Sequence, residues 1–209
     1  LTDLMPQFCI GVEATSIGDY KSLAGPLDGP RDIALAMSEA VLAADIDVAL
    51  SYRMQVDHGF SQALEVLLGG LDNYPVIPVF INSVAPPMAS CRRSRLLGDA
   101  IGRFLSGLNK RVLLVGSGGI SHEPPVSEIA NACAEVAERL IAGRNPTPQA
   151  RAARQERTIS AARQFTSGDI SLRPLNPEWD RNFLDILARG DWMAIDDMSN
   201  DSITEKGGK

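Results

Sequence analysis

Residues 57–84 read DHGFSQALEVLLGGLDNYPVIPVFINSV and contain both kinds of regular structure. The first half predicts a helix from about Ser61 to Leu68, which ends at the glycine pair that follows. The second half predicts a strand from Val76 to Ile81 that is buried on both faces, because its apolar run does not alternate with polar residues. A helix that leads into a fully buried strand is typical of α/β proteins.

The same alternation is found on both sides of this stretch. Phe8 to Val12 is a mostly apolar strand, and turn-forming glycines and prolines follow it. Helices are expected at Arg31 to Ala44 and Arg93 to Leu108, and further strands at Asp47 to Ser51 and Val112 to Val115. We therefore expect an α/β fold, a three-layer domain with a mainly parallel central sheet flanked by helices. Its most apolar strands, 76–81 and 112–115, are expected at the centre.

The remainder of the chain is predicted to be a helical C-terminal part. Helices are expected over Ser127 to Ile141 and Ala150 to Phe165, and another begins behind Pro177. The tail after Ser199 is polar and is expected to be mobile, because it has little to bury. Residues 1–209 are expected to form a single domain.

The composition fits one globular domain with a hydrophobic core: 209 residues, 44% of them hydrophobic and 22% charged. The net charge is -6 and the pI is about 5.0. Nucleic acids and anionic membranes bind clustered Lys and Arg, so the charge disfavours both as partners. A small molecule or another protein is the favoured partner.

Cysteine usage and hydropathy indicate the compartment. Cys9, Cys91 and Cys133 are odd in number, widely spaced and without a zinc-binding pattern, which is typical of reduced thiols in a cytoplasmic protein. The longest apolar runs have the length of strands, far short of the roughly 20 residues that span a bilayer.

The chain contains two histidines, and each follows an expected strand. His58 comes after the strand at 47–51 and its extension, and His122 comes after the strand at 112–115. Open α/β sheets bind ligands beyond the carboxyl ends of their strands, and an imidazole with its ordinary pKa of about 6.5 suits proton transfer near neutrality. A single histidine beside glycine is often only a turn residue, but two at one sheet edge can share a site. Asp57 or Glu123, the adjacent acids, can tune them.

Three other features allow two interpretations each. The GSGG turn, Gly116 to Gly119, can bind an anion on its backbone N–H groups or can simply be a tight turn, and it lacks the spacing of a phosphate-binding loop. Arg92, Arg93 and Arg95 can bind a substrate carboxylate or can be a solvated surface cluster. Glu178 fits the first turn of a helix, where the helix dipole favours an acid.

Five segments together resemble a known enzyme family. They are MPQFCIGVEATSIGDY, MQVDHGFSQALEVLLGG, PVIPVFINSVAPP, LNKRVLLVGSGGISHEPPV and LNPEWDRNFLDIL. The chain resembles the class III extradiol ring-cleavage dioxygenases over nearly all of its 209 residues, in the 2,3-dihydroxyphenylpropionate 1,2-dioxygenase branch. DHGF and GSGGxSHxPP at this separation are specific as a pair.

The resemblance implies a function for both histidines. The family opens a catechol with Fe(II) and O2, and the motif match makes His58 the proton donor and His122 the proton acceptor. The implied substrates are 3-(2,3-dihydroxyphenyl)propionate and 2,3-dihydroxycinnamate, which are cut beside the diol in aromatic catabolism. A homo-oligomer, in the family a tetramer, is implied as well.

The resemblance places the Fe(II) ligands, two histidines and one glutamate, outside this chain, which looks like an internal fragment of a catalytic domain truncated at both ends. Two alternatives stay open. In the first, His58, His122 and either Glu123 or Glu178 form the iron triad themselves, since the ligand count is right. In the second, the chain is a non-catalytic or phosphate-binding α/β module that uses the GSGG turn.

Overall fold

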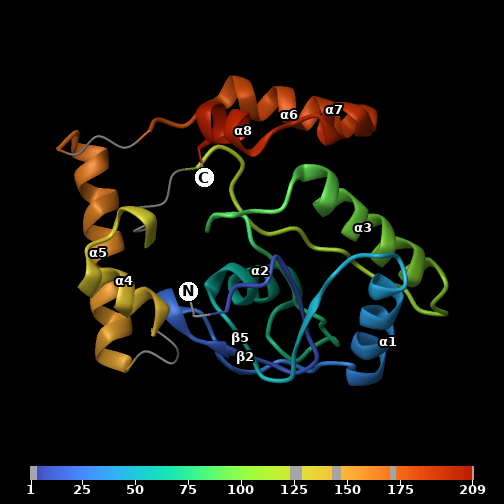
Figure 1. Cartoon of the computed structure of the whole chain (residues 1–209). Coiled ribbons are helices and arrows are strands. Elements are labelled where there is room, and N and C mark those ends of the chain that lie inside the picture. Colours follow the sequence, from blue (N-terminus) through green and yellow to red (C-terminus); the bar gives the residue numbers. More distant parts are fainter. Residues whose placement is uncertain (1–3, 123–128, 143–146, 170–172, 209) are drawn as a thin grey trace.

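The computed structural model describes residues 4–122, 129–142, 147–169 and 173–208, and it confirms the α/β class and the helical C-terminal part (Figure 1). Within these residues the strands are β1 (Phe8–Gly11), β2 (Ala14–Ile17), β3 (Ala24–Pro26), β4 (Ala49–Ser51), β5 (Met54–Val56) and β6 (Val79–Ile81). The helices are α1 (Arg31–Leu42), α2 (His58–Leu68), α3 (Cys91–Ser106), α4 (Ala134–Ile141), α5 (Pro148–Ser167), α6 (Pro177–Arg189), α7 (Trp192–Asp196) and α8 (Asn200–Gly207).

The strands form two small mixed sheets. In the first, the order is β4-β1-β6, and β1 runs parallel to β4 and antiparallel to β6. In the second, the order is β3-β2-β5, and β2 runs parallel to β5 and antiparallel to β3. The parallel pairing of β2 with β5 matters most for function, because it brings the carboxyl ends of these strands to the same edge.

Each sheet is covered by helices that bury its apolar residues. Helices α1 and α3 pack together over β1, around a core that includes Phe8, Ile10, Met37 and Leu97. Helix α2 packs on the second sheet through Leu64, beside a smaller core cluster. Two cores therefore hold the two sheets, and α2 is tied to the sheet that carries the β2–β5 edge.

The expected central strand at 76–81 lies at an edge instead. Only Val79–Ile81 is a strand, β6, and it is the outer strand beside β1. Phe80 and Ile81 are each 41% exposed. Pro78 explains the short strand, because proline has no N–H to donate to a neighbouring strand and is tolerated at strand starts and edges.

The prediction of a central strand from Val112 to Val115 was also wrong. These residues form no strand, and Leu113 and Leu114 are 68% and 70% exposed. A strand needs a backbone partner for its N–H and C=O groups, and no described strand pairs with this segment. Its apolar side chains consequently have no sheet on which to pack.

The tail after Ser199, expected to be mobile, is helical. Ser199 caps α8 by accepting a hydrogen bond from the Ser202 N–H at 3.1 Å. Gly207, at the end of α8, is buried against the Trp179 ring of α6, where an added Cβ would lie only 2.9 Å from the ring. The polar composition of the tail did not suggest burial. The tail is buried at Gly207 because the backbone there lies close to the Trp179 ring.

The three cysteines are free, as expected, and burial raises the pKa of the Cys9 and Cys91 thiols. The described part of the chain has no helix that is both long enough and apolar enough to cross a membrane.

The arginine cluster at the start of α3 joins that helix to α7. Arg95 binds Asp196 through two hydrogen bonds of 2.7 Å and also binds Asp99 at 2.7 Å. The hydrogen bonds from Arg95 lower the pKa of Asp196 and raise the pKa of Arg95. Arg93 lies over the Phe8 ring. Arg95, at least, is engaged within the chain and is not a free carboxylate-binding group.

We predict that Asp196→Asn lowers the urea midpoint at about pH 7 and that this loss shrinks as the pH falls below about 4. The pKa of Asp196 is lowered from 3.8 in the folded state, so the stability from its ion pair is complete above that value and is lost as the pH falls through the folded-state pKa. Urea unfolding across this pH range checks the prediction. Asp47→Asn, at an exposed residue without a described ion pair, is the control. A loss in Asp196→Asn that is equal at every pH would contradict the prediction.

Candidate active site

His58 follows a strand, as the sequence indicated: it lies two residues beyond the end of β5. It is also the first residue of α2, which begins three residues earlier than the expected start at Ser61. Asp57 is the N-cap of this helix, and its side chain accepts a hydrogen bond from the Gly59 N–H at 3.0 Å. Asp57 was one of the two acids expected to tune a histidine. Its side chain instead accepts from the backbone, so its local role is to begin the helix.

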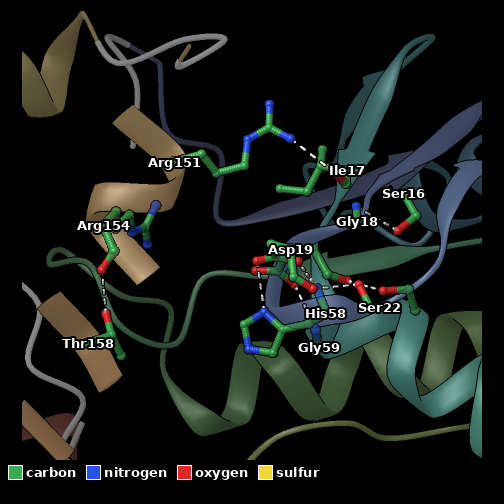
Figure 2. Close-up of polar contacts among 12 residues, drawn as sticks. Ser16, Ile17, Gly18, Asp19, Ser22, His58, Gly59, Arg151, Arg154 and Thr158 are labelled. Carbon is green, nitrogen blue, oxygen red and sulfur yellow. Dashed lines mark hydrogen bonds and ion pairs between the residues drawn. The ribbon is translucent and has the colours of Figure 1, made fainter. Parts of the chain in front are cut away.

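A different carboxylate binds His58. Asp19 Oδ2 lies 2.9 Å from His58 Nδ1, and Asp19 Oδ1 accepts a hydrogen bond from the His58 backbone N–H at 2.7 Å (Figure 2). The Asp19 side chain is 10% exposed, whereas the His58 side chain is 40% exposed. One buried carboxylate thus holds both the backbone and the ring of an accessible histidine.

The parallel pairing of β2 with β5 explains why Asp19 and His58 meet. Asp19 lies two residues beyond the end of β2, and His58 lies two residues beyond the end of β5. Paired parallel strands end at the same sheet edge, so residues that follow them become neighbours. Sequence analysis missed Asp19 because the contact joins residues 39 positions apart.

The turn that carries Asp19 has an unusual backbone. Gly18, Tyr20 and Lys21 have φ values of 68°, 48° and 66°. Positive φ is costly for residues with side chains, and such strain is often found at functional sites. Ser22 stabilises the turn, because its N–H and its hydroxyl both donate to the Asp19 carbonyl, at 2.9 and 2.8 Å.

Two further contacts surround this turn. The Tyr20 ring packs on the His58 imidazole with centroids 4.4 Å apart and planes inclined by 55°. From α5, Arg151 donates a hydrogen bond to the Ile17 carbonyl at 3.0 Å, just before the turn (Figure 2). The imidazole is therefore held by a carboxylate at one nitrogen and by an aromatic ring against its face.

His122 is held through its backbone. Its N–H donates to the Gly207 carbonyl at 2.8 Å, and the preceding Ser121 donates to Asp180 of α6 from both its N–H and its hydroxyl, each at 2.8 Å. The His122 residue is exposed, and no described residue makes a hydrogen bond with its imidazole. Sequence analysis missed Asp180, whose partner is 59 positions away.

The GSGG turn connects the two histidine segments. Ser117 donates a hydrogen bond from its hydroxyl to the Gly59 carbonyl, beside His58, and Gly119 lies against the His122 ring. The two imidazoles make no direct hydrogen bond with each other. No helix begins among the described residues directly after the turn, so it lacks the helix N-terminus of a phosphate-binding loop. This geometry disfavours the phosphate-binding alternative.

Among the described residues, Asp19, Asp57 and His58 offer possible metal-ligand atoms within 4.8 Å of one another. This group has one histidine and two carboxylates, not the two histidines and one carboxylate of a non-haem Fe(II) triad. It includes neither His122 nor Glu178, and Glu123 lies outside the described residues. Both Asp19 oxygens already accept hydrogen bonds from His58. Among the described residues, no candidate metal-ligand group combines His58 and His122 with Glu178.

The family described as the catalytic LigB subunit of aromatic ring-opening dioxygenase matches residues 1–209. The chain belongs to this LigB family. The resemblance to extradiol dioxygenases drawn from the sequence motifs is thereby confirmed.

Several curated relatives of this LigB chain carry the name 2,3-dihydroxyphenylpropionate/2,3-dihydroxicinnamic acid 1,2-dioxygenase. The protein of Cupriavidus pinatubonensis is 69% identical over 207 residues, which cover 99% of this chain and 66% of that protein. The protein of Paraburkholderia phymatum is 67% identical, with 99% and 65% covered. A second form from Dechloromonas aromatica is 55% identical, also with 99% and 65% covered. The chain thus spans slightly less than two thirds of these relatives' length.

We predict that Asp180→Ala loosens the His122 segment of the LigB chain. The substitution removes the acceptor of two hydrogen bonds from buried Ser121, and bonds to a charged partner are the strong ones. Amide hydrogen exchange at Ser121 and His122 should become faster by about 10-fold or more. Asp185→Ala, at an exposed residue of the same helix, is the control. Unchanged protection of both amides in Asp180→Ala would contradict the role of Asp180.

Proposed function

We propose that this chain is part of an Fe(II)-dependent extradiol dioxygenase that opens a catechol with O2 beside its two hydroxyl groups. Support comes from 67–69% identity to relatives named for 2,3-dihydroxyphenylpropionate and 2,3-dihydroxicinnamic acid dioxygenases. The observation in the structure that favours this chemistry is an accessible imidazole, His58, oriented by a buried carboxylate. That arrangement suits a group that transfers protons.

His58 and His122 divide the proton chemistry in this proposal. His122 is the base that accepts a proton from a catechol hydroxyl, and His58 is the acid that returns a proton as the ring opens. His58 has a fixed ring, and His122 has a fixed backbone with an accessible ring. The segments that carry them are joined by the hydrogen bond between Ser117 and Gly59.

The described residues do not fit the Fe(II) ligand set, so we place the metal ligands elsewhere in the longer protein. The chain has two histidines, and no candidate metal-ligand group in the described part of the chain includes both of them. The relatives extend beyond the matched region by about a third of their length. No proton step assigned to His58 or His122 depends on metal binding by this chain.

The proposed substrate is 3-(2,3-dihydroxyphenyl)propionate or 2,3-dihydroxycinnamate, together with O2. A hollow of about 520 Å3 lies between α6, α7 and α8, but neither histidine lines it, so we do not assign the catechol to it. The free cysteines and the acidic charge favour a cytoplasmic enzyme without a nucleic-acid or membrane partner. We propose a homo-oligomer, as the family resemblance implies.

Replacing either histidine tests the proposed roles. In a protein of the relatives' full length, His58→Gln and His122→Gln should each lower the ring-cleavage rate by about 10²- to 10⁴-fold, because each removes a proton-transfer group. Iron content should change little. Asp47→Asn is the control for handling and folding. Loss of bound iron in either histidine variant would identify that histidine as a ligand and refute its proton-transfer role.

The 209-residue chain alone should hold no stoichiometric Fe(II) and cleave no catechol. The reason is the ligand count, since its two histidines serve proton transfer in this proposal. Anaerobic loading with Fe(II), removal of free metal and an iron assay give the measurement. One tightly bound iron per chain, accompanied by ring cleavage, would contradict both the ligand placement and the proton roles.

A further inference from the structure

We propose that Asp19 is the positioning residue of His58: it keeps the proton on Nδ1 and thereby makes Nε2 the atom that exchanges protons with the substrate. The inference rests on the proposed function for its catalytic meaning. The tautomer itself can be measured without any catalysis.

The hydrogen-bonding capacity of each group fixes the tautomer. A carboxylate accepts hydrogen bonds and has none to donate, so the 2.9 Å contact between Asp19 Oδ2 and His58 Nδ1 requires a proton on Nδ1. The neutral imidazole then carries its lone pair on Nε2. Because Nδ1 stays protonated in the neutral and the charged ring alike, the proton that comes and goes is the one on Nε2.

The Asp19 contact favours the observed orientation of the imidazole over the flipped one. A half-turn of the imidazole would place a carbon opposite Asp19 Oδ2 and leave a buried acceptor without a donor, which is unfavourable. The Tyr20 ring also packs on the imidazole, with ring centroids 4.4 Å apart. Asp19 is itself fixed, because Ser22 donates two hydrogen bonds to its carbonyl.

Asp57, the sequence neighbour of His58, does not share this role. Its Oδ1 caps α2 at the Gly59 N–H, whereas both Asp19 oxygens point to His58. The same contact argues against a cation held by Asp19, Asp57 and His58 Nδ1, since a protonated Nδ1 that donates to Asp19 has no lone pair for a metal. Orientation of His58 by Asp19 accounts for these contacts, and no bound cation is needed to explain them.

The direct test is the imidazole 15N spectrum of the 209-residue chain, labelled at histidine. The chain has two histidines, so His122→Gln leaves the signals of His58 alone. At a pH where the ring is neutral, we expect the proton on Nδ1, the opposite of the tautomer that free histidine prefers. A neutral His58 with its proton on Nε2 would overturn the proposal without any change at Asp19.

Asp19→Asn should reverse the tautomer. An amide has one acceptor oxygen, which the His58 backbone N–H requires, so the amide NH2 faces Nδ1 and donates to it. The ring proton then moves to Nε2. Asp57→Asn is the matched control, because asparagine also caps helices well, and it should leave the proton on Nδ1. A folded Asp19→Asn chain that keeps the proton on Nδ1 would refute the role of Asp19.

Turnover separates the positioning role from the proposed function. In a protein of the relatives' full length, Asp19→Asn should lower kcat by about 10- to 100-fold with little change in KM, because orientation matters in the transition state. A change confined to KM would overturn the positioning role. Should His58→Gln leave ring cleavage intact, the proposed proton donor fails, and the 15N spectrum still decides whether Asp19 sets the tautomer.

Discussion

Burying the carboxylate of Asp19 constrains the whole second sheet. A carboxylate that is only 10% exposed needs hydrogen-bond donors at both oxygens, since an unpaired buried charge is strongly destabilising. Both donors come from His58, so the turn after β2 and the start of α2 must meet. The parallel pairing of β2 with β5 places them at one edge, and the core under Leu64 holds α2 there. The positive φ of Tyr20 is tolerated within this arrangement.

Local signals in the sequence predicted most helices, and they predicted that His58 follows a strand. Pro177 stands at the first turn of α6, Asn176 caps that helix, and Gly69 ends α2 in a left-handed conformation, each as the residue type indicates. The partner of His58 was not predictable in this way. Asp19 has an ordinary turn composition around it, and only the register of two strands far apart in the chain brings it to the imidazole.

The errors of the sequence analysis share one physical cause. An apolar run such as Val112 to Val115 shows that a segment can be buried, but burial also requires a partner with free backbone groups. The described residues supply no such partner, and the segment is exposed. The opposite error occurred at Gly207, where the absence of a side chain lets the backbone approach Trp179 closely. The composition of a segment shows whether its side chains are apolar, whereas its burial depends on the residues that pack against it.

His58 is held through its ring and its backbone, whereas His122 is held through its backbone, and this difference is compatible with the separate roles that we propose for them. An acid that must protonate one atom of a reacting ring gains from a fixed tautomer and a fixed direction, which Asp19 and Tyr20 give to His58. In the same proposal, the base that accepts a proton from a bound hydroxyl needs an accessible ring on an anchored backbone. His122 has that anchoring through Gly207 and, at the preceding Ser121, through Asp180. Asp57, the acid next to His58 in the sequence, was a poor guide to its partner, because the groups that hold the two histidines come from segments far away in the chain.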